Sequence, residues 1–129
     1  MHKTLIDSHV LLWLLYEPKK LGKEASKILQ TSNDVLVSMA SLFELTLKFN
    51  KGKLGASPAH ILKNTRASGL DILNIREPHI LNMVDVAPGV SDPFDQLIMS
   101  QAKTEGAVLL TADSLILKTE SEYILDVRL

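Results

Sequence analysis

The chain has 129 residues, no cysteine and a formal net charge of −1. A chain of this length fits one domain, residues 1–129, with a core of its own, and the lack of cysteine excludes disulfides and metal–thiolate sites. The first residues lack the apolar core and cleavage site of a signal peptide, and no apolar run is long enough to span a bilayer. We therefore expect a cytoplasmic protein that does not enter membranes.

The hydrophobic pattern predicts strands and helices that alternate along the chain. Strands are expected at residues 3–6, 35–37, 71–75, 107–110 and 123–127. Helices are expected at residues 8–15, 22–30, 39–50, 58–67, 77–84, 93–105 and 115–118. Such alternation is typical of an α/β fold in which helices cover both faces of a parallel sheet.

The predicted helix at residues 93–105 carries clear local signals. Asp92 is a suitable N-cap, Pro93 suits the first helical position, and Gly106 is a typical residue to end the helix. Asp95 falls in the first turn, where an acid complements the exposed amides, yet a helical projection places it on the packing side. The polar side of this helix is predicted to carry Gln96, Ser100 and Lys103.

The predicted helix at residues 39–50 has two apolar arcs, with Glu44 in a narrow polar strip between them. The residues of these arcs are Leu42, Leu45, Phe49, Ala40, Phe43 and Leu47. Two apolar faces are typical of an interior helix. We accordingly expect Phe43, like Trp13, to be a core residue rather than a platform for stacking bases.

Four acids are predicted to meet at one edge of the sheet. Asp7 and Asp113 each follow a predicted strand. Glu44 lies on the helix that leaves the second strand, and Asp95 begins a helix that faces the same edge. Because the carboxyl ends of parallel strands lie along one edge, where α/β folds bind ligands, we expect these carboxylates to converge.

Carboxylates gathered in one cleft repel each other unless a cation neutralises them. Mg²⁺ prefers oxygen ligands, and Mn²⁺ accepts the same donors. One such ion, or a pair roughly 4 Å apart, activates water and stabilises a phosphoryl transition state. The acids therefore predict phosphodiester chemistry that depends on a divalent metal.

A basic segment without any acid occupies residues 45–70 and would contact the phosphates of a nucleic acid. Its basic residues are Lys48, Lys51, Lys53, Lys63 and Arg66. From this segment we assign three lysines to substrate binding, together with the hydroxyl residues near Asp7 and Asp113. The set assigned to substrate binding is Ser8, Lys48, Lys51, Lys53 and Thr111.

Each acid also has a purely structural explanation, and these explanations stay open. Asp7 could cap a helix, and Asp113 could be an ordinary loop residue. Glu44 could pair with Lys48 one turn further along its helix, and Asp95 could serve only the helix N-terminus. The joint placement of the four acids favours a site over these separate explanations.

Other kinds of site find less support in the sequence. His9, His60 and His79 lack a zinc-ligand spacing, and the glycine-rich nucleotide-binding motifs are absent. A serine hydrolase would need an activating base that the sequence does not identify. A phosphatase with Asp7 as an aspartyl nucleophile would have a second acid two residues later, which this chain lacks.

Four segments resemble the PIN-domain family, specifically the VapC-type toxins of bacterial toxin–antitoxin modules. They are L-I-D-S-H-V-L-L-W at residues 5–13, V-S-M-A-S-L-F-E-L at 37–45, D-P-F-D-Q-L-I at 92–98 and L-L-T-A-D at 109–113. The segments occur in the family's order, and the resemblance extends from residue 3 to the end. It implies a PIN-like three-layer α/β/α sandwich around a mainly parallel sheet.

The resemblance also implies an activity and partners. The activity is that of an endoribonuclease dependent on Mg²⁺ or Mn²⁺, and its catalytic and metal-binding acidic quartet would be Asp7, Glu44, Asp95 and Asp113. The implied partners are the RNA substrate, a second copy in a homodimer, and a VapB-like antitoxin that occupies the active-site groove. Operator DNA would be bound only through the complex with the antitoxin.

The chain departs from the family pattern at two places. Ser8 stands where the family often has threonine, which keeps the hydroxyl group. Val90 and Ser91 stand where close relatives often have His-Arg, which bears on substrate choice. The competing hypothesis is a catalytically silent PIN-fold module that binds RNA or serves as a scaffold, and RNA would bind to such a module in the presence of a chelator.

Overall fold

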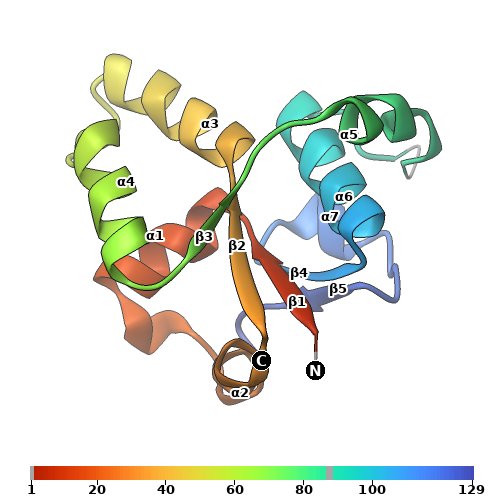
Figure 1. Ribbon diagram of the computed structural model, residues 1–129, viewed down its shortest axis with the longest axis horizontal. Coiled ribbons are helices and arrows are strands. Elements are labelled where there is room, and N and C mark those ends of the chain that lie inside the picture. Colours follow the sequence, from red (N-terminus) through yellow and green to blue (C-terminus); the bar gives the residue numbers. More distant parts are fainter. Residues whose placement is uncertain (1, 87–88) are drawn as a thin grey trace.

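The computed structural model describes residues 2–86 and 89–129 and shows an α/β sandwich around a five-stranded sheet (Figure 1). The strands lie in the order β3-β2-β1-β4-β5, and every neighbouring pair is parallel. Their bounds are β1 Lys3–Ile6, β2 Asp34–Ser38, β3 Asp71–Leu73, β4 Ala107–Thr111 and β5 Ile124–Asp126. The predicted parallel α/β fold is confirmed, although β3 is shorter than the predicted strand.

Helices cover both faces of the sheet, with α1, α3 and α4 on one side and α5, α6 and α7 on the other (Figure 1). The α-helices are α1 Ser8–Tyr16, α2 Lys23–Thr31, α3 Met39–Asn50, α4 Pro58–Ala67, α5 Glu77–Leu81, α6 Pro93–Glu105 and α7 Ser114–Leu117. Two 3-10 helices, η1 and η2, span Pro18–Lys20 and Asn82–Asp85. The helix predicted at residues 77–84 is therefore α5 followed by η2. No described helix is both long and apolar enough to cross a membrane.

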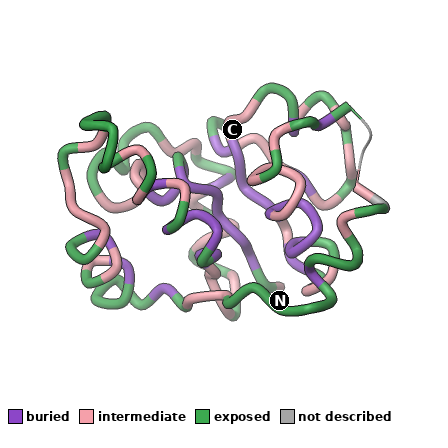
Figure 2. Tube along the Cα trace, turned by 90° about the horizontal axis from the view of Figure 1, so that it is seen from above, coloured by how far each residue is buried: buried purple, intermediate pink, exposed green. Residues whose placement is uncertain are grey.

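Alternate residues of the central strands point to opposite faces of the sheet and create two cores. Ile6 of β1 and Leu110 of β4 pack in the core beneath α1, α3 and α4. Leu5 and Leu109, their neighbours in the chain, pack in the core beneath α6 and α7. All four side chains are fully buried, and Figure 2 shows buried segments running through the middle of the molecule.

The strand order reverses at β1. From β1 the chain passes outward to β2 and β3, and it then returns to the other side of β1 as β4. In parallel sheets, ligands bind in the crevice beyond the carboxyl ends of the strands at such a reversal. Asp7 directly follows β1, and Thr111 ends β4. The topology therefore places both residues at this crevice.

The local signals of α6 are confirmed. One carboxylate oxygen of Asp92 accepts hydrogen bonds from the amides of Phe94 and Asp95, at 2.8 and 3.0 Å. Pro93 is the first helical residue, and Gly106 ends the helix with a φ of 64°. This left-handed conformation suits glycine, which has no Cβ to oppose it.

The prediction that α3 is an interior helix is wrong. Leu42 and Leu45 are buried in the core, but Met39, Phe43 and Leu47 form a stripe on the other side that remains exposed. Phe43 is 57% exposed, so its assignment to the core is also wrong. Each predicted arc is covered only in part, because Phe49 of the first and Phe43 and Leu47 of the second are exposed.

The predicted polar side of α6 is wrong in part because α5 packs against this helix. Ser100, which was expected at the surface, is 1% exposed. Its hydroxyl donates a hydrogen bond to the carbonyl of His79 at 2.6 Å. The hydroxyl therefore stays hydrogen-bonded although it is buried.

Residues near the end of the described chain pack against the N-terminus of α2. Gly22 is the N-cap of this helix, and no side-chain hydrogen bond caps the helix there. Its amide donates to the carbonyl of Val127 at 2.9 Å, and the amide of Glu24 donates to that of Leu129 at 2.8 Å. A Cβ at position 22 would collide with the backbone of Leu129. The backbone carbonyls of Val127 and Leu129 therefore supply the hydrogen-bond acceptors that the first amides of α2 need.

Candidate active site

Asp7 is held rigidly at the end of β1. It is the N-cap of α1, and its Oδ1 accepts a hydrogen bond from the amide of Val10 at 2.9 Å. Its Oδ2 accepts one from the hydroxyl of Thr111. The side chain is only 7% exposed, and this burial raises the pKa of the Asp7 carboxyl, while the two hydrogen bonds oppose the rise. The predicted capping role and the predicted site are thus compatible.

Thr111 connects two of the acids. Its hydroxyl donates to Asp7 and accepts a hydrogen bond from the amide of Asp113 at 3.0 Å. Asp113 is the N-cap of α7, where its Oδ1 accepts from the amides of Leu115 and Ile116. The ends of β1 and β4 are therefore joined side by side through one buried hydroxyl group.

Glu44 enters the site from α3. Its Oε1 accepts a hydrogen bond of 2.6 Å from the hydroxyl of Ser8, the first residue of α1. The alternative of an ion pair with Lys48 finds no support, because no such pair occurs within residues 2–86 and 89–129. Glu44 therefore turns toward α1 and the end of the sheet.

Asp95 lies in the first turn of α6, and the pKa of its carboxyl group is raised like that of Asp7. Its pKa rises to about 7, first because of burial and then because of the negative charges of Asp113, Asp92 and Glu44. The N-terminus of a helix would by itself favour the ionised form. The raised pKa therefore shows that burial and neighbouring acids outweigh the helix dipole here.

Charge effects of this kind connect all four acids. After burial, which is the largest cause for both groups, the charge of Asp113 raises the pKa of Asp7 and of Asp95. The donors are all carboxylate oxygens, which suit Mg²⁺ or Mn²⁺. In the part of the chain that the structure describes, however, no three His, Asp or Glu side chains are already arranged to hold a metal ion. The donor types fit such an ion, and the side chains would have to turn toward it.

The residues predicted to bind substrate lie at different distances from the acids. Ser8 and Thr111 are buried and bonded to Glu44 and Asp7. Lys48 is half-buried one turn beyond Glu44, whereas Lys51 and Lys53 are exposed past the end of α3. With a rise of about 1.5 Å per helical residue, Lys51 lies roughly 10 Å along the helix from Glu44. The lysines thus lie progressively farther from Glu44 along the chain and not among the acids.

An aromatic pair borders the acids and was missed from the sequence. The rings of Phe43 and Phe94 meet edge to face, with 5.6 Å between their centres. Each ring belongs to the residue just before an acid, Glu44 or Asp95. The pair therefore joins α3 to α6 beside the cluster. The only available signal was that each phenylalanine directly precedes a candidate acid.

A charge network centred on a buried histidine at the other end of α6 was also missed. His79 is fully buried, and its Nδ1 accepts a hydrogen bond of 3.0 Å from the amide of Arg76. Its Nε2 must therefore carry the proton that it donates to Glu105 at 2.8 Å. Arg76 also binds this carboxylate through its guanidinium group, and Lys3 lies 3.9 Å from it.

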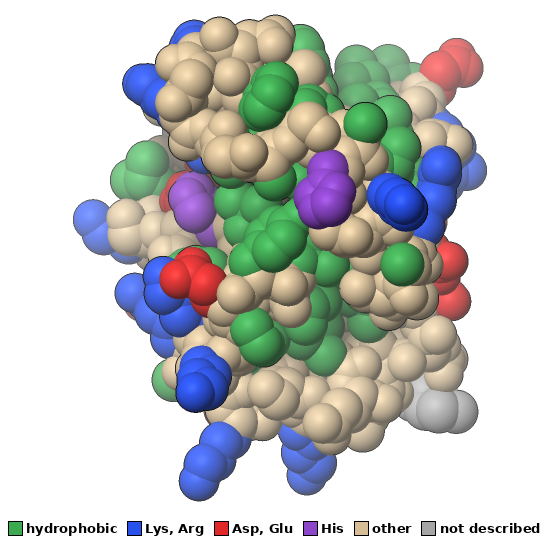
Figure 3. Space-filling model, turned by 90° about the vertical axis from the view of Figure 1, so that its left-hand side faces the viewer, with side chains coloured by type: hydrophobic (Ala, Val, Ile, Leu, Met, Phe, Trp, Pro, Cys, Tyr) green, Lys and Arg blue, Asp and Glu red, His purple; other side chains and the backbone are tan. Residues whose placement is uncertain are grey.

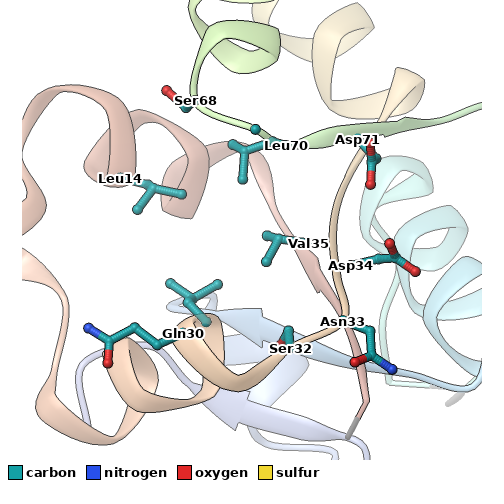
Figure 4. Close-up of a pocket in the computed structure, with 11 residues that line it drawn as sticks. Leu14, Gln30, Ser32, Asn33, Asp34, Val35, Ser68, Leu70 and Asp71 are labelled. Atoms are coloured by element: carbon teal, nitrogen blue, oxygen red, sulfur yellow. The ribbon is translucent and has the colours of Figure 1, made fainter.

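A pocket of about 480 Å³ lies at the opposite, amino edge of the sheet (Figure 4). Its apolar lining includes Leu14, Val35 and Leu70, which point into the hollow in the close-up. The carboxylates of Asp34 and Asp71 lie to one side of this apolar group. None of the four predicted acids lines this pocket, so we do not assign it to the candidate active site.

Comparisons with known proteins show the family and support the fold. The PIN domain model matches residues 4–121. Ribonuclease VapC22 from Mycobacterium tuberculosis is 28% identical over 116 residues, which are 88% of each chain. VapBC2 from Rickettsia felis, solved with a DNA fragment from its promoter, is similar in fold, with a TM-score of 0.67, 14% identity and coverage of 95% of this chain and 96% of that chain. DNA-bound VapBC from Salmonella typhimurium has a TM-score of 0.64, 16% identity and coverage of 92% of both chains. The chain belongs to the PIN-domain family.

Proposed function

We propose that this protein is a VapC-type toxin, an endoribonuclease that hydrolyses RNA phosphodiester bonds with the help of Mg²⁺ or Mn²⁺. Its catalytic and metal-binding groups would be Asp7, Glu44, Asp95 and Asp113. The observation that carries the proposal is the gathering of acids at the strand reversal, where burial and the charges of Asp113 and Glu44 help to raise the pKa of Asp95 to about 7. Like charges are brought together at a cost in stability, and a cation would relieve it. The similarity to a protein named as a ribonuclease supports the same activity.

The protein's own groups would divide the work as follows. A bound divalent ion would supply a polarised water and charge neutralisation at the scissile phosphate. Asp7, fixed by Val10 and Thr111, would give the ion a rigid ligand. Asp95 and Asp113 would complete the cluster from α6 and from the end of β4. Hydrolysis of this type leaves a 5′-phosphate and a 3′-hydroxyl.

RNA would bind across α3 and the segment after it. Lys48, Lys51 and Lys53 follow Glu44 along α3 and the segment after it, and residues 45–70 hold no acid. Such a series of cations binds consecutive phosphates without reading the bases. Binding should therefore weaken strongly as the salt concentration rises, by a similar factor for RNAs of different sequence.

A VapB-like antitoxin and a second copy of the chain are the proposed protein partners. On the side that carries α1, α3 and α4, apolar side chains gather in the middle of the surface, with Lys and Arg toward the edges (Figure 3). A groove of about 310 Å³ between α1 and the segment after α3 is lined by Leu12, Tyr16, Leu54 and Ala56. Exposed apolar surface of this kind is typical of interaction sites. Operator DNA would be bound only through the antitoxin complex; the VapBC2 and VapBC proteins that are similar in fold were solved with bound DNA.

The test is to incubate purified protein, free of antitoxin, with total RNA in Mg²⁺, Mn²⁺ or EDTA. We expect discrete fragments with metal and none with EDTA. Asp7→Asn should lower the cleavage rate by about 100-fold or more, because each 1.4 kcal/mol lost from transition-state stabilisation costs a factor of ten. Circular dichroism would check that this variant is folded. Full activity of Asp7→Asn would exclude the assignment.

One observation favours a second candidate, a catalytically silent PIN-fold module that binds RNA or serves as a scaffold. In residues 2–86 and 89–129, no group of three or more His, Asp or Glu side chains is already arranged to hold a metal ion. This candidate predicts that RNA binding persists in EDTA and that no metal produces cleavage. End mapping of any fragments would decide between the two and identify the RNA that is cut.

A further inference from the structure

The contact between Ser8 and Glu44 indicates a role for Ser8 other than substrate binding. The hydroxyl of Ser8 is 2.6 Å from the carboxylate and donates its proton to it. A short hydrogen bond to a charged acceptor is among the stronger ones in proteins. Ser8 is 3% exposed, so an RNA molecule has almost no access to this hydroxyl.

The position of Ser8 is set by the same elements that hold Asp7. Asp7 pairs with β4 through its amide, which donates to the carbonyl of Leu110 at 3.3 Å, and its carbonyl begins α1 by accepting from Leu11. Ser8 is the first residue of that helix. Its hydroxyl is therefore a fixed point beside the cluster, not a mobile side chain.

Glu44 needs such a fixed point more than the other acids do. Asp7 and Asp113 are tied down by backbone amides at the starts of helices, and Asp95 has a short side chain on the first turn of α6. Glu44 has a longer side chain, and within the described residues its carboxylate receives a hydrogen bond only from Ser8. Repulsion from Asp95 would turn an untethered Glu44 toward solvent.

We infer that Ser8 is a positioning residue, whose hydroxyl keeps the Glu44 carboxylate turned toward the acidic cluster so that it can share a divalent cation. The inference rests on the proposed function for the cation, while the tether itself is a property of the metal-free protein. Oε1 is held by Ser8, which leaves Oε2 for another partner. Partners of this kind, which orient a metal ligand, typically change metal affinity by about 10- to 100-fold when they are removed.

The variants follow from this geometry. Ser8→Ala removes the donor, whereas Ser8→Thr keeps a hydroxyl at the same position. Ser114→Ala is the matched control, because Ser114 is likewise the first residue of a helix capped by an acid, but its side chain is exposed. Thermal unfolding of each variant would confirm that it is folded.

The first measurement is Mn²⁺ binding by titration calorimetry, without RNA. We expect Ser8→Ala to bind about tenfold more weakly, with Ser8→Thr and Ser114→Ala close to the wild type. In a Glu44→Gln background, Ser8→Ala should cause almost no further loss, because Ser8 acts through the Glu44 carboxylate. Equal Mn²⁺ affinity of Ser8→Ala and wild type, or a full tenfold loss in the Glu44→Gln background, would overturn the inference.

The second measurement needs no metal and separates this inference from the proposed function. Carbon-13 relaxation of the Glu44 side chain in EDTA should show an ordered group in the wild type and in Ser8→Thr, and a mobile one in Ser8→Ala. If the wild type bound no Mn²⁺, the proposed metal site would fail, and the relaxation data would still decide whether Ser8 holds Glu44. Equal side-chain order in all three proteins would refute the positioning role.

Discussion

The two ends of α6 carry acids that respond to their surroundings in opposite ways. Asp95 lies at the N-terminus, where the helix dipole favours a carboxylate, yet its pKa is raised to about 7. Glu105 is the last helical residue, where the dipole disfavours a carboxylate, yet its pKa is lowered, first by the hydrogen bond from His79 and also by Arg76. Burial and neighbouring acids at Asp95, and hydrogen-bond donors at Glu105, therefore outweigh the helix dipole.

The comparison separates the proposed metal site from a network whose role is structural. At Glu105, each charge has an opposite partner and the hydrogen-bonding groups are satisfied, as expected where the role is stability. At Asp95, the negative charges of Asp113, Asp92 and Glu44 all raise the pKa, as expected for the proposed site that would bind a cation. The same substitution of an acid by its amide should thus have opposite effects on stability at the two ends.

The largest effect is expected for Glu105→Gln. The amide keeps the size of the side chain but loses the charge that binds Arg76 and His79, so the free energy of unfolding should fall by about 2 kcal/mol. Urea denaturation at pH 7 would measure this change. Glu122→Gln, at an exposed position, is the control and should change stability by less than about 0.5 kcal/mol. An unchanged free energy of unfolding for Glu105→Gln would show that the network does not stabilise the fold.

The stability difference between wild type and Glu105→Gln should also depend on pH. The lowered pKa means that folded Glu105 stays ionised where the unfolded chain, with an ordinary value of 4.5, takes up a proton. This stabilisation is complete above the ordinary pKa and is lost as the pH falls through the lower, folded value. The two proteins should therefore keep a constant difference from pH 7 to about pH 5 and converge at more acidic pH. A constant difference across the whole range would contradict the lowered pKa.

The smallest effect, and the opposite sign, is expected for Asp95→Asn in EDTA. Removing one of several like charges should raise the free energy of unfolding, by less than about 1 kcal/mol because the side chain is partly exposed to screening solvent. The same denaturation experiment applies. Glu122→Gln again serves as the control, because it removes one negative charge at an exposed position. Destabilisation by Asp95→Asn would mean that this acid has a favourable partner and is not held against repulsion.

Local features of the fold could be predicted because they depend on residues close in sequence. The cap at Asp92, the start at Pro93 and the end at Gly106 were all confirmed, since each follows from backbone requirements of a single helix terminus. The strand β1 was found with its bounds at Lys3 and Ile6. The alternation of strands and helices then sufficed to predict a parallel sheet.

Proximity of the four acids could be predicted from topology, but their contacts could not. Placing Asp7 and Asp113 at strand ends required only the chain order. That Ser8 donates to Glu44, 36 residues later, depends on how α1 and α3 pack. The pairing of His79 with Glu105, 26 residues apart, likewise needs the position of α5 on α6.

The wrong predictions for α3 and α6 also arose because packing between helices cannot be read from one helix alone. An apolar arc on α3 indicates surface that avoids water but does not say what covers it, and Phe43 remains exposed in this chain. Ser100 looks polar in projection, yet α5 covers it and supplies the His79 carbonyl as an acceptor. Burial of a helix face is decided by its neighbours, which periodicity within one helix does not reveal.

The attachment of α2 to the backbone of residues 127–129 has a consequence for the order of folding. The starting turn of α2 receives its acceptors from Val127 and Leu129, so this early helix cannot be completed on the ribosome until those late residues have been synthesised. Contacts that span most of a chain must close a long loop before they gain energy, and they slow folding. We therefore expect α2 to assemble late, as a closing step rather than as a nucleus.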